Sequence, residues 1–159
     1  MKTLNLLSIL FLGFGLIFTN PILASEYGNQ KVVYHINYDN PKKQTGALRN
    51  IQNHINAVGA EKLDIKVVLH GNGLALLVEP DALNNLPKFK HANANDKMTA
   101  KISSLKNQGV SFQVCANTVR GRKVDIDNHL YDVTQNDIVP SGVAELAKLQ
   151  AMGYVYIKP

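Results

Sequence analysis

The feature that most constrains the fold is an alternation of two hydrophobic periods along the chain. Runs of β-branched and apolar residues alternate with segments whose apolar residues recur every three or four positions. Three helical segments end on a glycine, at Gly59, Gly109 and Gly153, and an apolar run follows each. Glycine adopts a positive φ without a Cβ clash, so it lets the chain turn back along a sheet. The alternation therefore predicts parallel β-α-β units with helices on both faces.

The expected strands cover residues 31–37, 65–69, 110–114 and 154–157. We expect helices over residues 48–58, over a segment marked by Met98, Ile102 and Leu105, over a short segment that starts at Ala116, and over residues 141–150. Between them, residues 74–78 are expected to form a helical turn, residues 81–94 to be irregular, and residues 125–137 to form a loop or broken helix. Strands of a parallel sheet are buried on both faces, and we expect this of residues 67–69 and 155–157. The predicted fold class is α/β, a three-layer Rossmann-like sandwich with a mostly parallel sheet. The strand order is left open.

The first residues predict export. Lys2 precedes an uncharged apolar stretch over residues 4–18, and the small residue Ala24 offers a cleavage site. The stretch is shorter than the roughly 20 apolar residues that a membrane-spanning helix needs. We therefore predict a signal peptide over residues 1–24, cleavage after Ala24, and a periplasmic or secreted single domain over residues 25–159 with no membrane attachment. An uncleaved N-terminal anchor is the alternative.

The charge pattern argues against nucleic-acid binding. The net charge is +5, but the lysines are scattered along the chain. Arg120, Arg122 and Lys123 form the one tight basic group, and no aromatic residue is interleaved with them. Nucleic-acid binding usually needs a concentrated basic face or aromatic stacking platforms. A solvated surface explains these charges, and no nucleic-acid partner is predicted.

The chain contains one cysteine, Cys115. One cysteine cannot form a disulfide within its own chain, although exported domains often use such pairs as staples. A single thiol in an oxidising compartment is either buried and inert, reactive, or paired with another molecule. The function of Cys115 is therefore the sharpest question that the sequence poses.

Three candidate segments lie where predicted strands end. They are residues 37–39, residues 70–73, which read His-Gly-Asn-Gly, and residues 115–117. In open parallel sheets, ligands gather beyond the carboxyl ends of the strands, so these three segments are expected at one edge. Gly71 and Gly73 there could cradle an anion, but glycines after a strand are more often turn residues, and the segment lacks the spacing of nucleotide-binding motifs.

Cys115 is expected at the amino end of a short helix. Unpaired N–H groups and the helix dipole favour an anion there, and Arg120 and Arg122 add positive charge, so the thiol pKa should fall. If the imidazole of His70 came within hydrogen-bonding reach, it could pair with the thiolate or shuttle a proton. The alternatives stay open: Cys115 could fill space in the core, and His70 could cap a loop through backbone hydrogen bonds.

Other chemistries are not predicted. The histidines apart from His70 show no metal-ligand spacing, and residues 125–128 lack the ring of oxygens of a calcium loop. A Gly-x-Ser-x-Gly nucleophile elbow does not occur. We therefore predict no metal and no cofactor.

Several segments together carry a family resemblance. They are residues 32–36, 67–74, 112–118, 139–146 and 153–159, in this order. With this order and spacing the chain resembles the DsrE/DsrF-like family of small α/β proteins, best known from sulfur-relay systems. The match covers most of the chain after the predicted signal peptide.

The resemblance implies a Rossmann-like fold, assembly into trimers or hexamers, and a cysteine that accepts sulfur as a persulfide and passes it to a partner. That cysteine corresponds to Cys115, with His70 as a possible proton shuttle. Ligand contacts are expected from the remaining candidates: Gly71, Asn72, Gly73, Asn117 and Arg120. No cofactor is needed, and donor and acceptor proteins are implied partners.

Export departs from the well-known relay members, which work in the cytoplasm, so donor and acceptor must differ here. Whether the chain is an enzyme, of sulfurtransferase type, stays open. The alternatives are a non-enzymatic binding module and an oligomeric structural subunit, with Cys115 only a packing residue in either case.

Overall fold

A computed structural model describes residues 27–159 of the chain. The predicted signal peptide over residues 1–24 and the cleavage site after Ala24 lie outside the described residues.

The described residues form a single parallel sheet of five strands in the order β4-β3-β2-β1-β5. Its strands are β1 (Gln30–Ile36), β2 (Leu63–Leu69), β3 (Ser111–Cys115), β4 (Ile138–Val139) and β5 (Val155–Ile157). Every neighbouring pair is parallel, and β1 pairs with β2 along its full length. The predicted α/β class and Rossmann-like sandwich are confirmed.

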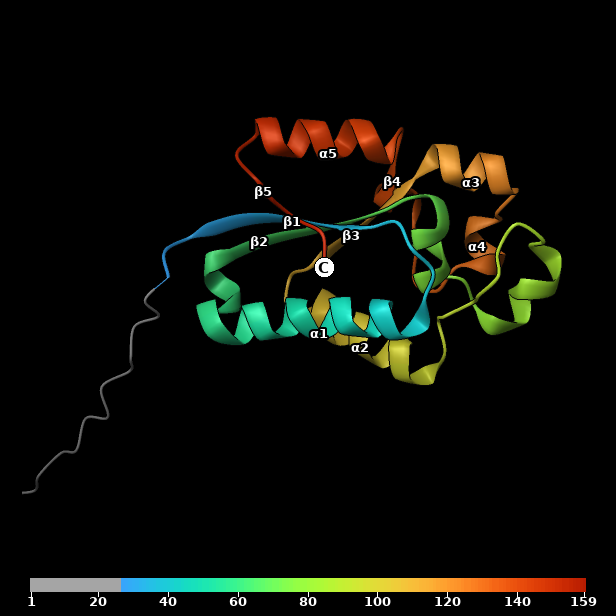
Figure 1. Cartoon of the computed structure of the whole chain (residues 1–159), viewed down its shortest axis with the longest axis horizontal. Coiled ribbons are helices and arrows are strands. Elements are labelled where there is room, and N and C mark those ends of the chain that lie inside the picture. Colours follow the sequence, from blue (N-terminus) through green and yellow to red (C-terminus); the bar gives the residue numbers. More distant parts are fainter. Residues whose placement is uncertain (1–26) are drawn as a thin grey trace, which may run out of the picture.

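Helices cover both faces of the sheet (Figure 1). The α-helices are α1 (Pro41–Val58), α2 (Asp96–Asn107), α3 (Ala116–Arg122), α4 (Ile126–His129) and α5 (Gly142–Ala151). Helices α1 and α2 lie on one face, and α3 and α5 lie on the other. Short 3-10 helices complete the chain: η1 (Ala60–Lys62), η2 (Gly71–Leu76), η3 (Pro80–Asn85) and η4 (Gln135–Asp137).

Alternation along the strands divides the core into two parts. The larger part fills the α1 and α2 side and includes Val32 and Val67. The smaller part lies under α5, where Val33 and Val68 pack with Leu146 and other α5-side residues. Because side chains alternate between the faces of a strand, His35 follows Val33 onto the α5 side, and His70 follows Val68. Two histidines are thereby directed to one face.

Local signals explain where the main helices begin and end. The side chain of Asn40 accepts a hydrogen bond from the N–H of Lys43 at 3.0 Å, and Pro41 occupies the first turn of α1. The residues after α1, α2 and α5 include Gly59, Gly109 and Gly153, with φ of 100°, 90° and 88°. These positive angles confirm the predicted glycine turns.

One expectation for the C-terminal half was wrong, and one strand was missed. Strand β5 was expected to be buried on both faces, but it lies at the edge of the sheet, with Val155 62% and Tyr156 40% exposed. An edge strand and a central strand share the same β-branched and aromatic composition, so the sequence did not distinguish them. Strand β4, which pairs with β3 through two residues only, was not predicted.

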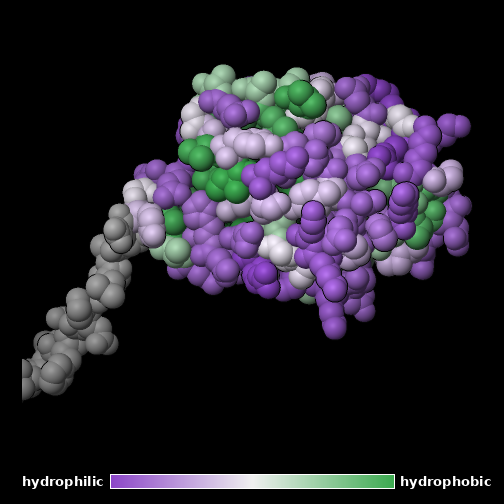
Figure 2. All heavy atoms as spheres, viewed as in Figure 1, coloured by the Kyte–Doolittle hydropathy of each residue, from purple (hydrophilic) through white to green (hydrophobic). Residues whose placement is uncertain are grey.

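The surface is mostly polar in the view of Figure 2, with apolar atoms gathered over the region of α5 and β5. The large apolar side chains exposed there are Val143, Met152, Val155 and Tyr156. Within residues 27–159, no helix has the length and apolar character needed to cross a membrane.

Candidate functional site

The three predicted strand tips lie at the same edge of the sheet. Strands β1, β2 and β3 are adjacent and parallel, and they end at Ile36, Leu69 and Cys115. The segments that follow them therefore leave the sheet on one side (Figure 1).

Cys115 is both the last residue of β3 and the N-cap residue of α3. The predicted short helix after it is confirmed by α3. The cysteine is free and only 4% exposed. It therefore lies just beneath the surface of the edge, at a point where two elements meet.

Polar hydrogens around the sulfur favour its negative form. Burial raises the pKa of the Cys115 thiol, and this is the largest single effect. The backbone N–H groups of Gly142, Thr118 and Asn117 and the Thr118 hydroxyl oppose burial and together lower the pKa below its ordinary value. The Cys115 side chain does not form a regular N-cap hydrogen bond with α3.

The amino end of a second helix, α5, lies beside Cys115. The side chain of Ser141 caps α5 by accepting a hydrogen bond from the N–H of Ala144, and Gly142 is the first residue of that helix. A Cβ atom on Gly142 would lie 2.9 Å from the Cβ of His70 and 3.3 Å from the Cβ of Cys115. Only glycine therefore lets the amino end of α5 approach both side chains. Gly142 was not predicted as a site residue.

His70 forms part of a histidine pair. The Nε2 atoms of His70 and His35 lie 2.7 Å apart, and the Nδ1 atom of His35 lies 2.6 Å from the hydroxyl of Tyr156. The planes of the two rings are inclined by 21°, with centroids 4.7 Å apart. Stacked rings cannot bring two atoms this close, so the rings meet edge to edge through an N–H···N hydrogen bond.

Both imidazoles are neutral near pH 7. Burial, followed by the charges of His70 and Lys158, lowers the pKa of His35 to about 4. Burial and Lys158 also lower the pKa of His70. The structure places His70 at the predicted edge, but its Nε2 atom contacts His35, while the donors that lower the thiol pKa come from α3 and α5.

The glycine-containing segment after β2 packs tightly against its neighbours. Gly71 has a φ of 55°, and its N–H donates to the Oγ1 atom of Thr118 at 2.8 Å. A Cβ atom on Gly73 would lie 1.9 Å from the carbonyl oxygen of Ile36, so Gly73 is a close-approach residue. Gly71 is thus linked to Cys115 through Thr118, whereas Gly73 joins η2 to the end of β1.

The two exposed asparagines among the predicted site residues, Asn72 and Asn117, accept hydrogen bonds from arginines of α3. Arg120 donates to the Oδ1 atom of Asn117 at 2.5 Å, and Arg122 donates to the Oδ1 atom of Asn72 at 2.5 Å. Asn72, Asn117 and Arg120 are exposed. The contribution of Asn117 at the sulfur is its backbone N–H, and the thiol pKa is lowered by N–H and O–H groups rather than by the predicted arginine charges.

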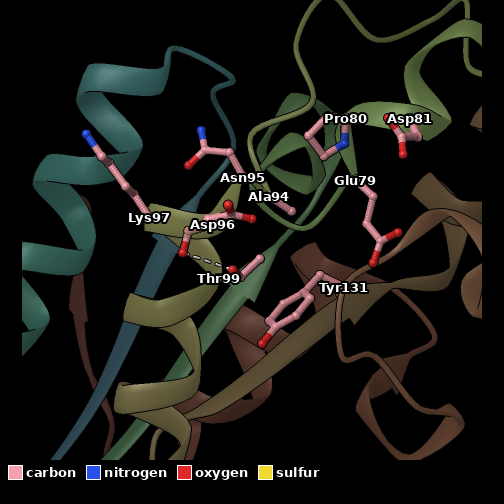
Figure 3. Close-up of a pocket in the computed structure, with 9 residues that line it drawn as sticks. All are labelled: Glu79, Pro80, Asp81, Ala94, Asn95, Asp96, Lys97, Thr99 and Tyr131. Atoms are coloured by element: carbon pink, nitrogen blue, oxygen red, sulfur yellow. Dashed lines mark hydrogen bonds between the residues drawn. The ribbon is translucent and has the colours of Figure 1, made fainter.

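A sizeable cavity lies away from Cys115 and His70. It has a volume of about 630 Å³ and is lined by residues of η3, the start of α2 and the segment after α4 (Figure 3). Cys115 and His70 are not among its lining residues. Over residues 27–159 there is no group of three or more His, Cys, Asp or Glu side chains placed to hold a metal ion.

Sequence reasoning missed His35, Tyr156, Thr118 and Gly142. The pairing of His35 with His70 depends on the register of β1 against β2, in which His35 stands opposite Val68. The positions of Thr118 and Gly142 depend on how two helices meet at the edge. The one available signal was period-two alternation, which directs His35 and His70 to one face once the strands are aligned.

Comparison with known proteins agrees with this architecture. The structure of a protein of unknown function from Methanobacterium thermoautotrophicum, MTH1491, is similar with a TM-score of 0.65 and 28% sequence identity. The similarity covers 82% of this chain and 100% of that one. No curated protein matches the chain. The model of the DsrE/DsrF-like family matches residues 30–159, and the chain belongs to this family.

Proposed function

We propose that the protein carries sulfur as a persulfide on Cys115. At the level of the family, membership supports a role of the sulfur-relay type. The observation that carries the proposal is the convergence of three backbone N–H groups and one hydroxyl on a single sulfur, which lowers its pKa despite burial. The thiolate is the nucleophilic form of cysteine, so this arrangement favours attack on sulfur.

The proposed transfer balances without an oxidant. The Cys115 thiolate attacks the terminal sulfur of a donor persulfide, and a new S–S bond forms as the donor S–S bond breaks. The electron pair of the broken bond leaves on the inner sulfur of the donor, which departs as a thiolate and takes a proton. Attack by an acceptor thiolate on the terminal sulfur of the Cys115 persulfide then returns the Cys115 thiolate.

In this proposal His70 is the proton shuttle. Its ring packs beside Gly142, which also contacts Cys115, and its lowered pKa keeps the imidazole in the neutral form that can accept a proton. The side chains of Asn72, Asn117 and Arg120 are exposed at the same rim and would contact the sulfur donor. Gly71 and Gly73 would shape the backbone beneath it.

The setting of this chemistry is part of the proposal. Export directed by residues 1–24, followed by cleavage after Ala24, would place the domain in the periplasm or outside the cell, where donor and acceptor differ from cytoplasmic ones. We propose assembly into trimers or hexamers, and the exposed apolar side chains near α5 and β5, such as Val143 and Val155, offer contact area.

Mass spectrometry after incubation with polysulfide tests the proposal. Wild-type protein is expected to gain a sulfur-mass adduct that dithiothreitol removes, and Cys115→Ser is expected to gain none. Since Cys115 is the only cysteine, this variant is a complete control. An unmodified wild-type protein would contradict the proposal.

The 4% exposure of Cys115 favours a second candidate, a binding module in which the cysteine is a packing residue. In that case Cys115→Ala keeps binding of a small anion such as thiosulfate, while His70→Ala or Asn72→Ala weakens it. Isothermal titration of the three variants separates the candidates, because a sulfur carrier requires the thiol itself.

A further inference from the structure

Thr118 has an unusual position for a helical threonine. It is the third residue of α3 and only 9% exposed, and Cys115 is the N-cap of the same helix. The side chains at the N-cap and at the third helical position are neighbours in capping boxes, so the Thr118 hydroxyl lies beside the sulfur.

The hydrogen bond of Thr118 runs in the opposite direction from those of other helical threonines. Thr45 donates its hydroxyl proton to the carbonyl of Pro41 at 2.9 Å, and Thr99 donates to the carbonyl of Asp96 at 3.1 Å. These bonds lie within their own helices and are common. The Oγ1 atom of Thr118 instead accepts the N–H of Gly71 at 2.8 Å, a contact between two segments 47 residues apart.

This acceptor role leaves the hydroxyl proton for another partner. A threonine hydroxyl has one proton to donate and two lone pairs, and one lone pair of Thr118 receives the Gly71 N–H. Cys115 is the N-cap of the same helix, so its sulfur neighbours this hydroxyl and is the group that the proton would stabilise. Gly71 holds its N–H in this direction through a left-handed backbone, with a φ of 55°.

We propose that Thr118 is the positioning residue of the site: its oxygen, held by the N–H of Gly71, directs the hydroxyl proton to the sulfur of Cys115. The inference rests on the proposed function in assigning that sulfur a nucleophilic role. It adds that the segment after β2 acts on the sulfur through Thr118 rather than by direct contact. A movement of Gly71 would then shift the Thr118 hydroxyl and change the pKa of the Cys115 thiol.

The experiment measures the rate of iodoacetamide alkylation of native protein against pH. The isosteric variant Thr118→Val removes the hydroxyl, and the midpoint of the rate profile is expected to rise by about one pH unit, since a hydrogen bond to a charged group is lost. Thr118→Ser keeps the hydroxyl and is expected to restore the wild-type midpoint. Thr118→Ala gives an independent reading without a methyl group beside Gly71.

The ionisable side chains on the elements next to Cys115 stay the same in all variants. They are His70 after β2, Arg120 of α3 and Glu145 of α5, which is paired with Lys148. Thr99→Val is the matched control, because it removes a helical hydroxyl that bonds within α2, and it is expected to leave the midpoint unchanged.

Two results would overturn the proposal: an unchanged midpoint in folded Thr118→Val and Thr118→Ala, or an equal rise in Thr118→Ser. No sulfur donor is present, so the reading does not depend on persulfide formation. The midpoint can move in a protein that takes up no sulfur, and sulfur uptake can persist in one whose midpoint is insensitive to Thr118. The two proposals therefore fail separately.

Discussion

The Nε2 atom of His35 lies 2.7 Å from the Nε2 atom of His70, so the N–H of one ring donates a hydrogen bond to the bare nitrogen of the other. A protonated ring carries hydrogen on both nitrogens, and two protonated rings could not keep this bond. The bond between the rings therefore requires at least one of the two imidazoles to be neutral. The hydroxyl of Tyr156 at the Nδ1 atom of His35 extends the contact to the edge strand β5.

This pair predicts a loss of stability in mild acid. The pKa of His35 is about 4 in the folded chain and about 6.5 in an unfolded one, so between these values the unfolded chain binds more protons. Stability is then complete above about pH 6.5 and falls as the pH is lowered toward 4, by on the order of 2 kcal/mol for this group.

Urea denaturation at pH 7.5 and pH 5 measures the effect. His35→Asn is expected to flatten the pH dependence, while the exposed His91→Asn is expected to leave it as in the wild type. Equal pH dependence in His35→Asn and in the wild-type protein would show that the pair does not couple folding to protonation.

The close approach of α5 predicts a strong effect of a single methyl group. Gly142→Ala places a Cβ atom 2.9 Å from the Cβ of His70, so the amino end of α5 must shift away from the edge. We expect a loss of about 1–3 kcal/mol in the free energy of unfolding, together with a higher thiol pKa, because the Gly142 N–H moves from the sulfur.

Gly46→Ala is the matched control for this change. Gly46 lies within α1, and a Cβ atom there meets nothing within 4 Å. This variant is expected to stabilise the protein by about 0.5–1 kcal/mol, since alanine is the better helix former. Thermal unfolding of both variants decides the matter, and a Gly142→Ala protein as stable as Gly46→Ala would refute the packing account.

The two arginines of α3 are predicted to differ. Arg122 donates to the carbonyl of Lys88 at 2.6 Å, and its guanidinium lies 4.4 Å from the ring centroid of Phe89. Arg122→Ala is expected to lower the free energy of unfolding by about 1–2 kcal/mol, because these contacts and the hydrogen bond to Asn72 are lost.

Arg120→Ala is expected to change stability by less than about 0.5 kcal/mol, because Arg120 is exposed and bonds to Asn117 in its own helix. Chemical denaturation of the two variants side by side provides the measurement. A larger loss in Arg120→Ala than in Arg122→Ala would run against the observed contacts.

The sequence predicted the parts of the fold that depend on local pattern. The glycines after the helices and the apolar runs after them specified parallel β-α-β units, and the edge at which His70 and Cys115 lie followed from strand direction. The exposed position of β5 was not predictable, because Val155 and Tyr156 suit an edge strand as well as a central one.

The interior of the site was less predictable for a different reason. The contacts of His35 with His70, and of Gly142 with Cys115, join segments distant in sequence. They depend on strand register and on the angle at which α5 meets the edge. Arg120 and Arg122 were expected to lower the thiol pKa by their charge, but N–H and hydroxyl groups do so, and no composition pattern signals their direction.

The most direct test of a nucleophilic Cys115 is the alkylation of the native wild-type protein by a small electrophile across a range of pH. The account predicts reaction without denaturant and a midpoint below that of free cysteine, because the N–H groups of Gly142, Asn117 and Thr118 stabilise the thiolate. A thiol that reacts only after the protein is unfolded, or one with the midpoint of free cysteine, would contradict it.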